Sequence, residues 1–137
     1  MTIRILAVEP KNVGEVSYIM QGTIERLLRR GSQGFHPLGV IDRVMKEEAV
    51  MWVIADDDRP MGIAFTHIER WVEGNVLRIL AVAGDGMSEW LEIFTDAMKD
   101  HGRNNQCIRM VTEGRKGWEK ALGLKPVRYV YEMEIEQ

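Results

Sequence analysis

The chain has 137 residues, a formal net charge of −3 and a sequence pI of about 5.7. This length predicts one domain that spans residues 1–137 and has a core of its own. The acidic balance argues against a nucleic-acid binder, and the single cysteine, Cys107, excludes an internal disulfide. No apolar run is long enough to cross a membrane, so we expect a cytoplasmic protein that does not bind membranes.

The N-terminal part of the chain predicts one strand and two helices. Apolar and polar residues alternate over residues 2–8, which is typical of a strand. Asn12 is placed to cap a helix, and Gly14 and Gly22 should make this helix irregular, because glycine destabilises a helix interior by up to about 1 kcal/mol. A loop over residues 31–37 leads to a second helix over residues 38–48. The second helix is expected to bury Val40, Ile41, Val44 and Met45.

Two hairpins follow these helices. Residues 50–55 predict a strand, the tract Asp56-Asp57-Asp58-Arg59-Pro60 predicts a turn, and residues 61–71 predict the returning strand. Glu73-Gly74-Asn75 predicts a second turn. The aspartate tract lacks the glycine and the distal glutamate of an EF-hand, so we interpret it as a hairpin turn and not as a calcium loop.

The segment from residue 76 to residue 102 organises the rest of the chain. Its first part, residues 76–83, is rich in Val, Ile and Leu, which predicts a strand covered on both faces. Gly84-Asp85-Gly86 then breaks the chain, and Ser88 is placed to cap a helix. Trp90 and Phe94 are four residues apart on that helix and should both face the sheet.

The start of this helix is a candidate ligand site. Its first backbone N–H groups have no intrahelical partner and follow directly on a buried strand. Such groups form a ready site for an anion. The alternative is a tight strand-to-helix turn that binds nothing, and the local residues leave both interpretations open.

The C-terminal part predicts a strand, a short helix and a final strand. Residues 107–112 are apolar enough for a strand, and residues 114–122 predict a helix that Gly123 and Pro126 end. Residues 127–135 alternate, which predicts a half-buried strand. The resulting order β-α-α-β-β-β-α-β-α-β predicts an α/β (α+β) fold: a mixed sheet of six or seven strands, with helices on both faces and residues 77–82 in a central strand.

Three passages, taken in their order and spacing, carry a resemblance to a known family. The first is the acidic hairpin between Trp52-Val53-Ile54-Ala55 and Met61-Gly62-Ile63-Ala64, and the second is the strand, turn and helix of residues 80–98. The third and most specific is Trp118-Glu119-Lys120-Ala121-Leu122-Gly123-Leu124-Lys125-Pro126-Val127. Together they resemble the GNAT superfamily of N-acetyltransferases over nearly the whole chain.

The resemblance implies that acetyl-coenzyme A binds where the central strand splays from its parallel neighbour. By position, Ala81, Val82 and Ala83 would border the pantetheine, and Gly84, Gly86, Met87 and Ser88 would hold the pyrophosphate. The chain departs from the family's Q/R-x-x-G-x-G/A loop, because its loop is shorter, opens without Arg or Gln and carries Asp85. A like charge beside the phosphates is unfavourable, so we expect weak binding.

Amine acetylation needs a base that takes the proton of the attacking ammonium. His67 and Glu69 are two residues apart on one predicted strand, so they share a face and either could act as the base if that face lines the cleft. The alternative is that both are solvated surface residues near a hairpin end. Arg78 lies inside the apolar strand, and we interpret it as the partner of Glu69, with a carboxylate or phosphate of the substrate as the alternative.

An acid that protonates the leaving thiolate is harder to place. The position of the closing-helix tyrosine that often serves in this family holds Glu119. Tyr131, in the predicted last strand, is our candidate for the acid, and core packing is the alternative. His36 lies in a loop that often shapes the acceptor pocket in this family. No second histidine stands at ligand spacing from His101, so we predict no metal.

Two interpretations of the whole chain follow. The first is an acyl-coenzyme A-dependent N-acyltransferase that acts on a small amine or a peptide amine. The second is a non-catalytic GNAT-like domain with a decayed cofactor loop and a role in binding or assembly, as in the small phage and prophage proteins that the chain loosely resembles. The loop at residues 84–87 favours the second and the family resemblance favours the first, which we place first. A homodimer is one assembly that the sequence allows.

Overall fold

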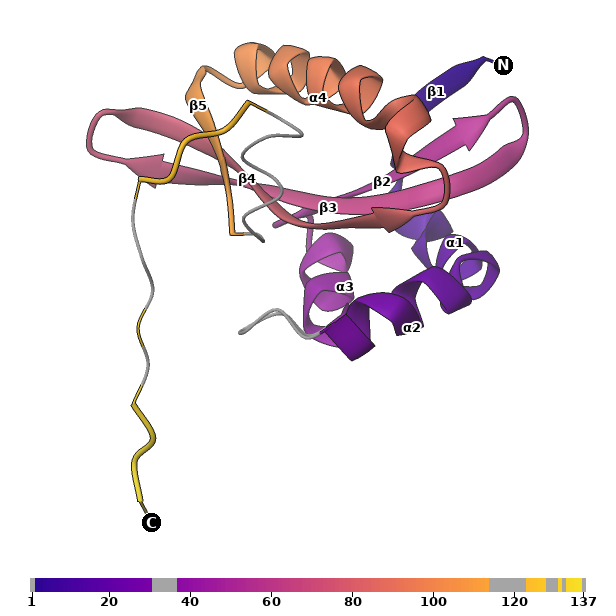
Figure 1. Ribbon diagram of the computed structural model, residues 1–137, viewed down its shortest axis with the longest axis horizontal. Coiled ribbons are helices and arrows are strands. Elements are labelled where there is room, and N and C mark those ends of the chain that lie inside the picture. Colours follow the sequence, from indigo (N-terminus) through magenta and orange to yellow (C-terminus); the bar gives the residue numbers. More distant parts are fainter. Residues whose placement is uncertain (1, 31–36, 114–122, 128–130, 132, 137) are drawn as a thin grey trace.

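The computed structural model describes the chain except residues 1, 31–36, 114–122, 128–130, 132 and 137. The described elements are β1 (Ile3–Val8), a 3₁₀ turn (Pro10–Asn12), α1 (Val13–Ile19), α2 (Gln21–Arg30), α3 (Pro37–Met45), β2 (Val50–Asp56), β3 (Arg59–Trp71), β4 (Gly74–Gly84), α4 (Met87–Asn104) and β5 (Cys107–Thr112). Figure 1 shows a twisted sheet with α4 on one face and α1, α2 and α3 on the other.

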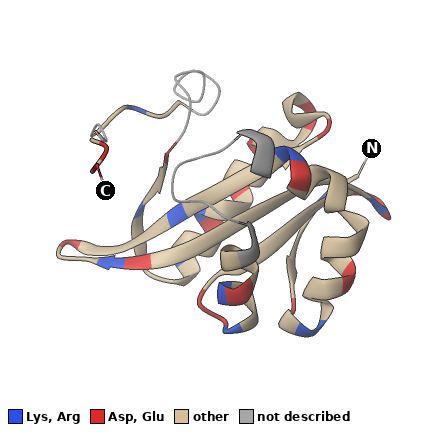
Figure 2. Ribbon diagram, turned by 90° about the horizontal axis from the view of Figure 1, so that it is seen from below, with Lys and Arg blue, Asp and Glu red and all other residues tan. Residues whose placement is uncertain are grey.

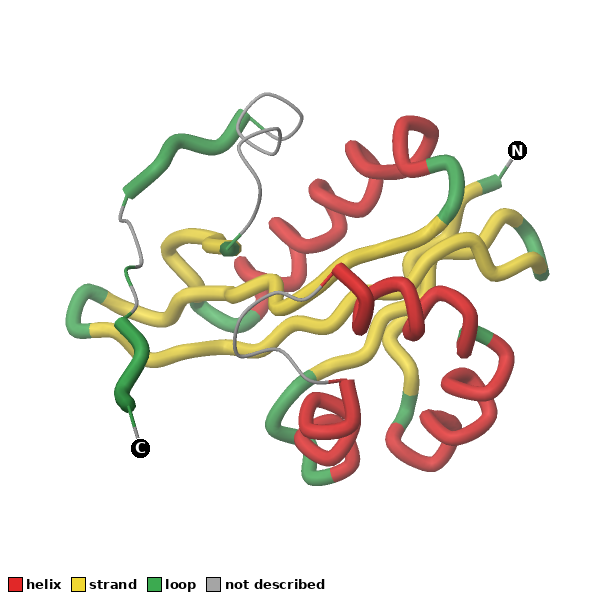
Figure 3. Tube along the Cα trace, turned by 60° about the horizontal axis from the view of Figure 1, so that its bottom comes forward, coloured by secondary structure: helices red, strands yellow, loops and turns green. Residues whose placement is uncertain are grey.

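The described sheet has five strands in the order β1-β2-β3-β4-β5. Strands β1 to β4 are antiparallel to their neighbours, and β5 is parallel to β4. The predicted mixed sheet with helices on both faces is therefore confirmed. Strand β4 lies between β3 and β5 only as far as Ile79, so of residues 77–82, which were predicted to be central, residues 77–79 have a described strand on both sides (Figure 3). Six or seven strands were predicted, and the described residues form five.

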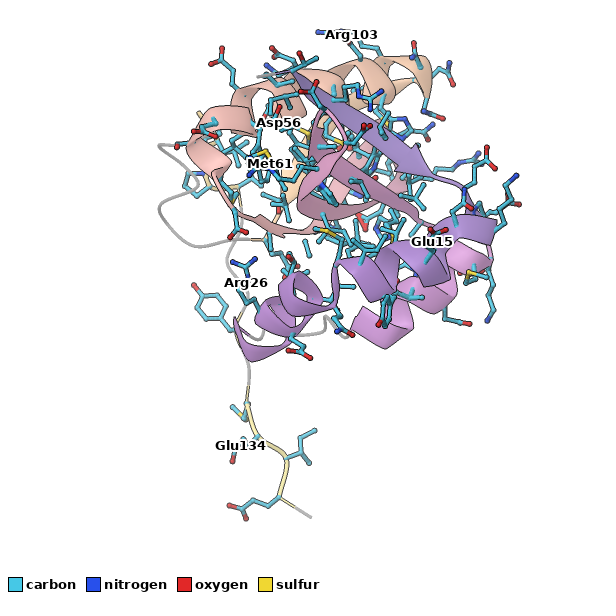
Figure 4. All side chains as sticks on the ribbon, turned by 90° about the vertical axis from the view of Figure 1, so that its right-hand side faces the viewer. Glu15, Arg26, Asp56, Met61, Arg103 and Glu134 are labelled. Atoms are coloured by element: carbon cyan, nitrogen blue, oxygen red, sulfur yellow. The ribbon has the colours of Figure 1, made fainter. Side chains whose placement is uncertain are left out.

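The predicted last strand accounts for part of this difference. The described residues between 127 and 135 lie in no strand, and Val127, Tyr131, Met133 and Ile135 are exposed. Figures 1 and 4 show this C-terminal segment, which includes Glu134, running away from the sheet. Alternation produces a strand only where another strand or a core lies beside it, because β-propensity mainly measures packing on neighbours. The predicted helix over residues 114–122 lies outside the described residues.

Helix α4 covers one face of the sheet with a continuous apolar stripe. Trp90, Phe94 and Met98 are buried, and the rings of Trp90 and Phe94 meet edge to face with centroids 6.2 Å apart, which confirms the predicted orientation. The indole of Trp90 lies so close to β3 that a Cβ at Gly62 would be 2.8 Å from its Cζ2. Glycine at position 62 therefore lets the largest core side chain reach the sheet.

The start of α4 differs from the prediction. The N-cap is Gly86, in the left-handed conformation with φ of 66°, and Ser88 lies inside the first turn. The amide of Asp85 still donates to the carbonyl of Met61 at 2.8 Å, so the chain leaves the sheet and enters the helix within two residues. A turn this tight needs the positive φ that glycine adopts at little cost, and a serine cap does not supply it.

The opposite face is covered by short helices. The single helix predicted after Asn12 is two, α1 and α2, separated at the buried residue Met20, and the side chain of Asn12 caps neither. Gly22 lies at the start of the second, in agreement with the expected irregularity. In α3, Val40 and Val44 are buried as predicted, but Met45 is 52% exposed because the helix ends there and turns its last side chain outward.

Candidate functional site

Strand β4 loses its parallel neighbour partway along its length. Its pairing with β5 ends at Ile79 and Thr112, while β4 itself continues to Gly84. The hydroxyl of Thr112 donates to the carbonyl oxygen of Ile79 at 3.0 Å and so closes the ladder. Beyond that bond, residues 80–84 pair with β3 on one side and with no described strand on the other.

An irregularity in β4 lies at the same point. Phe65 faces Ala81 and Thr66 faces Ile79 in the β3–β4 register, so Leu80 is an extra residue on β4. Such a bulge bends its strand and increases the local twist. The bulge therefore coincides with the end of β5, and beyond Ile79 the edge of β4 has no described partner on that side.

A cluster of polar side chains lies one residue before this opening. His67 and Arg78 are register partners on β3 and β4, and Glu69 lies on the same face of β3 as His67. The Nε of Arg78 donates to Oε2 of Glu69 at 2.9 Å, and Nε2 of His67 lies 3.2 Å from the same oxygen. The indole N–H of Trp71 donates to Oε1 of Glu69 at 3.2 Å. Glu69 is therefore held by three partners, and its predicted pairing with Arg78 is observed.

These contacts shift the pKa values of the cluster. The hydrogen bond from Arg78, supported by those from Trp71 and His67, lowers the pKa of Glu69 to about 2. Burial lowers the pKa of His67, although its bond to Glu69 opposes that change. Glu69 is thus a carboxylate and His67 a neutral imidazole at neutral pH. Of the two predicted bases, His67 has the pKa suited to accepting a proton, because a carboxyl with a pKa of about 2 is a very weak base.

Two residues outside these strands complete the cluster. The Nη2 of Arg43, from the last turn of α3, contacts Nδ1 of His67. Nη1 of Arg78 lies 3.7 Å from Oε1 of Glu113, which directly follows β5 and is 64% exposed. The cluster is therefore assembled from α3, β3, β4 and the end of β5, and the interpretation of His67 and Glu69 as solvated surface residues is wrong. Their side chains are only 13% and 27% exposed.

Two acidic residues and one arginine lie around the start of α4: Asp85 in the loop before it, Glu89 in its first turn and Arg26 from α2. Nη1 of Arg26, from α2, lies 3.1 Å from Oδ1 of Asp85, whose side chain is 80% exposed (Figure 4 labels Arg26). The carboxylate of Glu89 lies back against Gly86, since a Cβ there would be 3.1 Å from Oε2 of Glu89. Both carboxylates thus lie near the first amides of α4, and Arg26 offsets the charge of Asp85.

The structure brings some of the predicted site residues together and not others. Ala81 and Ala83 pack in the core cluster under α1 to α3, whereas Val82 packs in the cluster under α4. The loop residues Gly84, Gly86, Met87 and Ser88 follow directly at the end of β4. Tyr131 is 86% exposed, in the C-terminal part of the chain. His36 lies outside the described residues.

Sequence reasoning missed Arg43 and Arg26. Arg43 is 24 residues from His67 in the chain, and Arg26 is 59 residues from Asp85, so no local spacing connects either pair. For Arg43 the sequence did carry one indication, the amphipathic pattern of its helix. Arg43 follows Val40 by three residues, so it borders the buried face of α3.

Charged residues of both signs are distributed over the described part of the chain (Figure 2). Lys and Arg alternate with Asp and Glu along the described ribbon in the view of Figure 2. No group of three or more His, Cys, Asp or Glu in the described ranges could hold a metal ion. Across the described helices, none is long and apolar enough to span a membrane.

Neither a protein-family model nor a curated protein sequence matches the chain. Solved structures do. A ribosomal-protein-alanine N-acetyltransferase from Brucella melitensis biovar Abortus 2308 superposes with a TM-score of 0.73 at 9% identity, covering 98% of this chain and 100% of that one. A GNAT family acetyltransferase from Staphylococcus aureus gives 0.70 at 9% identity with coverage of 98% and 100%. Glucosamine-6-phosphate N-acetyltransferase from Arabidopsis thaliana gives 0.65 at 16% identity with coverage of 99% and 100%.

These similarities extend over nearly the whole length of each protein. The chain therefore has the fold of the GNAT acetyltransferases, which confirms the fold that the sequence resemblance implied. At such low identity the match establishes the fold and leaves the activity to be argued from the residues of the site.

Proposed function

We propose that this protein is an acyl-coenzyme A-dependent N-acyltransferase that uses acetyl-coenzyme A and acts on a small amine or a peptide amine. The observation that carries the proposal is the edge of β4 beyond Ile79, where residues 80–84 have no described partner on the β5 side. An exposed strand edge can pair with the amides of an extended ligand. The neighbouring cluster around His67 supplies a base next to Ile79, where this edge begins.

The residues present fit the acyl donor along most of its length. Ala81, Val82 and Ala83 would border the pantetheine, because they lie in the part of β4 that has no described partner on the β5 side. The amides of Gly86, Met87 and Ser88 would meet the pyrophosphate, because no side chain caps the start of α4. Gly84 is required for this path, since a Cβ there would lie 2.4 Å from the carbonyl oxygen of Met61.

His67 is the base in this proposal. Acyl transfer forms a bond between the acceptor nitrogen and the thioester carbon, breaks the carbon–sulfur bond and releases the ammonium proton. The neutral imidazole of His67 accepts that proton at Nδ1, while its Nε2–H remains directed at Glu69. The thiolate takes its proton from solvent, since Tyr131, the predicted acid, is 86% exposed. Replacing a general base usually slows turnover by about 10²–10⁴-fold.

The alternative is a non-catalytic GNAT-like domain, of the kind found in phage or prophage proteins, that keeps the fold for binding or assembly. The placement of Glu89 favours it, because its carboxylate lies over Gly86 where a phosphate would bind. A carboxylate near phosphates raises the cost of binding. Arg26 reduces this cost for the carboxylate of Asp85, but not for that of Glu89.

Calorimetric titration with acetyl-coenzyme A tests the two functions. We expect a dissociation constant weaker than about 10 μM, which corresponds to roughly −7 kcal/mol. Glu89→Gln should tighten binding, and Glu92→Gln, on an exposed residue of the same helix, should not. His67→Ala should then lose turnover with the dissociation constant unchanged. No heat from the wild type or from Glu89→Gln would support the non-catalytic domain instead.

A further inference from the structure

Arg43 differs from the other arginines in its surroundings. Of the arginines whose side chains the structure describes, Arg26, Arg43 and Arg78 are half-buried. Arg26 pairs with Asp85 and Arg78 pairs with Glu69, but no carboxylate of a described residue lies within ion-pair distance of Arg43. A partly buried charge is costly unless it is paired. The carbonyl end of α3 offsets part of this cost, because Arg43 lies in the last turn of that helix.

Among the residues that the structure describes, His67 is the polar side chain that Arg43 contacts. A guanidinium can only donate, so Nδ1 of His67 must be the accepting nitrogen and its proton must lie on Nε2. Nε2 then donates to Glu69 at 3.2 Å. Both ring nitrogens are therefore engaged, and the lone pair of His67 is not accessible to an incoming ammonium while Arg43 remains in place.

We propose that Arg43 binds an anionic group of the amine acceptor, a carboxylate or a phosphate, and that this binding frees Nδ1 of His67 to accept the amine proton. The inference rests on the proposed acyl transfer and specifies its acceptor class. The planar fork of an arginine binds both oxyanions in a bidentate manner. Arg78 does not compete for this role, because Glu69 at 2.9 Å and Glu113 at 3.7 Å already neutralise it.

The proton and charge balance of this step is complete within the cluster. The ammonium loses one proton to Nδ1, so His67 becomes an imidazolium with Nε2–H still directed at Glu69. The carboxylate of Glu69 neutralises the new charge, and Arg78 keeps that carboxylate oriented through its bond at 2.9 Å. Arg43, now paired with the acceptor's anion, no longer repels the imidazolium as it does in the ligand-free arrangement.

NMR of the histidine ring nitrogens tests the site without coenzyme A. Acetate and inorganic phosphate are the two probes, and the tighter one identifies the anion. We expect a saturable shift at His67 with a rise in its pKa, and no change at His101, whose pKa is lowered by burial alone. Arg43→Gln should weaken anion binding about tenfold or more, because it removes charge-assisted hydrogen bonds. Arg70→Gln, on an exposed arginine of β3, is the matched control.

Turnover with paired acceptors gives a second readout. Alanine should be acylated faster than ethylamine, which lacks only the carboxylate. In Arg43→Gln this preference should disappear, because the carboxylate of alanine loses its partner. A preference unchanged in Arg43→Gln, or no response of His67 to either anion, would overturn the proposal. If the proposal for Arg43 fails but coenzyme A still binds, the proposed acyltransferase stands. If the anions bind but coenzyme A does not, the result counts against the acyltransferase alone.

Discussion

The two faces of the sheet use the same strands for different purposes. On the face under α4, the described side chains that meet the helix are nearly all apolar. The indole N–H of Trp52, which is buried there, donates to the buried hydroxyl of Thr66 at 2.9 Å. On the face under α1 to α3, the apolar core ends at Phe65, and the next residues on that face are His67 and Glu69. One face thus stabilises the sheet, and the other changes from core to ionisable cluster within one strand.

The two faces differ because the helices that cover them differ in length. Helix α4 runs for 18 residues along the sheet, whereas α1, α2 and α3 have 7, 10 and 9 residues. The described short helices do not extend along the far part of β3 and β4 (Figure 1), and the ionisable side chains there are half-buried and keep partial contact with solvent. A site can therefore be placed beside a core without burying unpaired charge.

The largest expected effect is on the face under α4. Phe94→Ala leaves a cavity in a fully buried position, so the free energy of unfolding should fall by about 3–5 kcal/mol, out of about 5–15 kcal/mol for a typical domain. Denaturant unfolding measures this loss. Ile93→Ala, at a neighbouring position that is 44% exposed, is the control and should change little. Equal losses in the two variants would show that α4 is not seated as described.

On the opposite face, Glu69→Gln should reduce stability by about 1–3 kcal/mol at neutral pH, because Arg78 loses its charged partner. The pKa of Glu69 is about 2 in the folded protein against 4.5 for the free group, so its contribution is present above pH 4.5 and is lost as the pH falls toward 2. The difference between variant and wild type should therefore shrink over that range. A constant difference at every pH would mean that the ion pair is not its source.

A smaller effect is expected on the pH dependence of stability, from two histidines that lie on opposite faces. Burial lowers the pKa of His67 and of His101, which packs edge to face on Trp52 with ring centroids 4.9 Å apart. Below a pH of about 6.5 the unfolded chain takes up protons that the folded protein does not, so stability should decrease as the pH falls. His101→Phe should flatten this decrease without altering turnover. If the slope is unchanged, His101 is not buried in its neutral form.

The smallest effect is expected at the loop before α4. Asp85→Asn removes a charge that is 80% exposed and already paired with Arg26, so coenzyme A should bind less than about fivefold more tightly. Arg26→Gln should weaken binding by a similar factor. Calorimetry measures coenzyme A binding by both variants at low and at physiological salt. Both changes in affinity should be smaller at physiological salt, because screening reduces them. A large gain in Asp85→Asn would show that the carboxylate points into the ligand path.

Much of the fold could be predicted from residue patterns, because the contacts behind it are local. The hairpin turns, the strand over residues 107–112 and the inward face of α4 depend on neighbours a few residues apart. The pairing of Glu69 with Arg78 was also accessible, since a hairpin brings them together. The break at Met20 and the glycine cap at Gly86 were not, because tertiary packing decides where a helix begins.

The parts of the site that no pattern revealed are the contacts between distant elements. Arg43 reaches His67 from α3, and Arg26 reaches Asp85 from α2, so both depend on how the helices lie on the sheet. The C-terminal segment shows the opposite failure. Its alternation is a strong local signal, yet the described residues from 133 to 136 lie in no strand, because a local pattern does not guarantee a partner.

The order of the strands also bears on how the molecule forms and opens. All five described strands lie in the sheet in chain order, but β3 and β4 form a hairpin, whereas β5 joins β4 in parallel through the crossover of α4. Contacts close in sequence generally form first, and closing a longer loop costs more chain entropy. The hairpin that holds His67, Glu69 and Arg78 should thus be assembled before β5 docks. Amide hydrogen exchange should accordingly be slowest in β3 and the paired part of β4, and faster in β5.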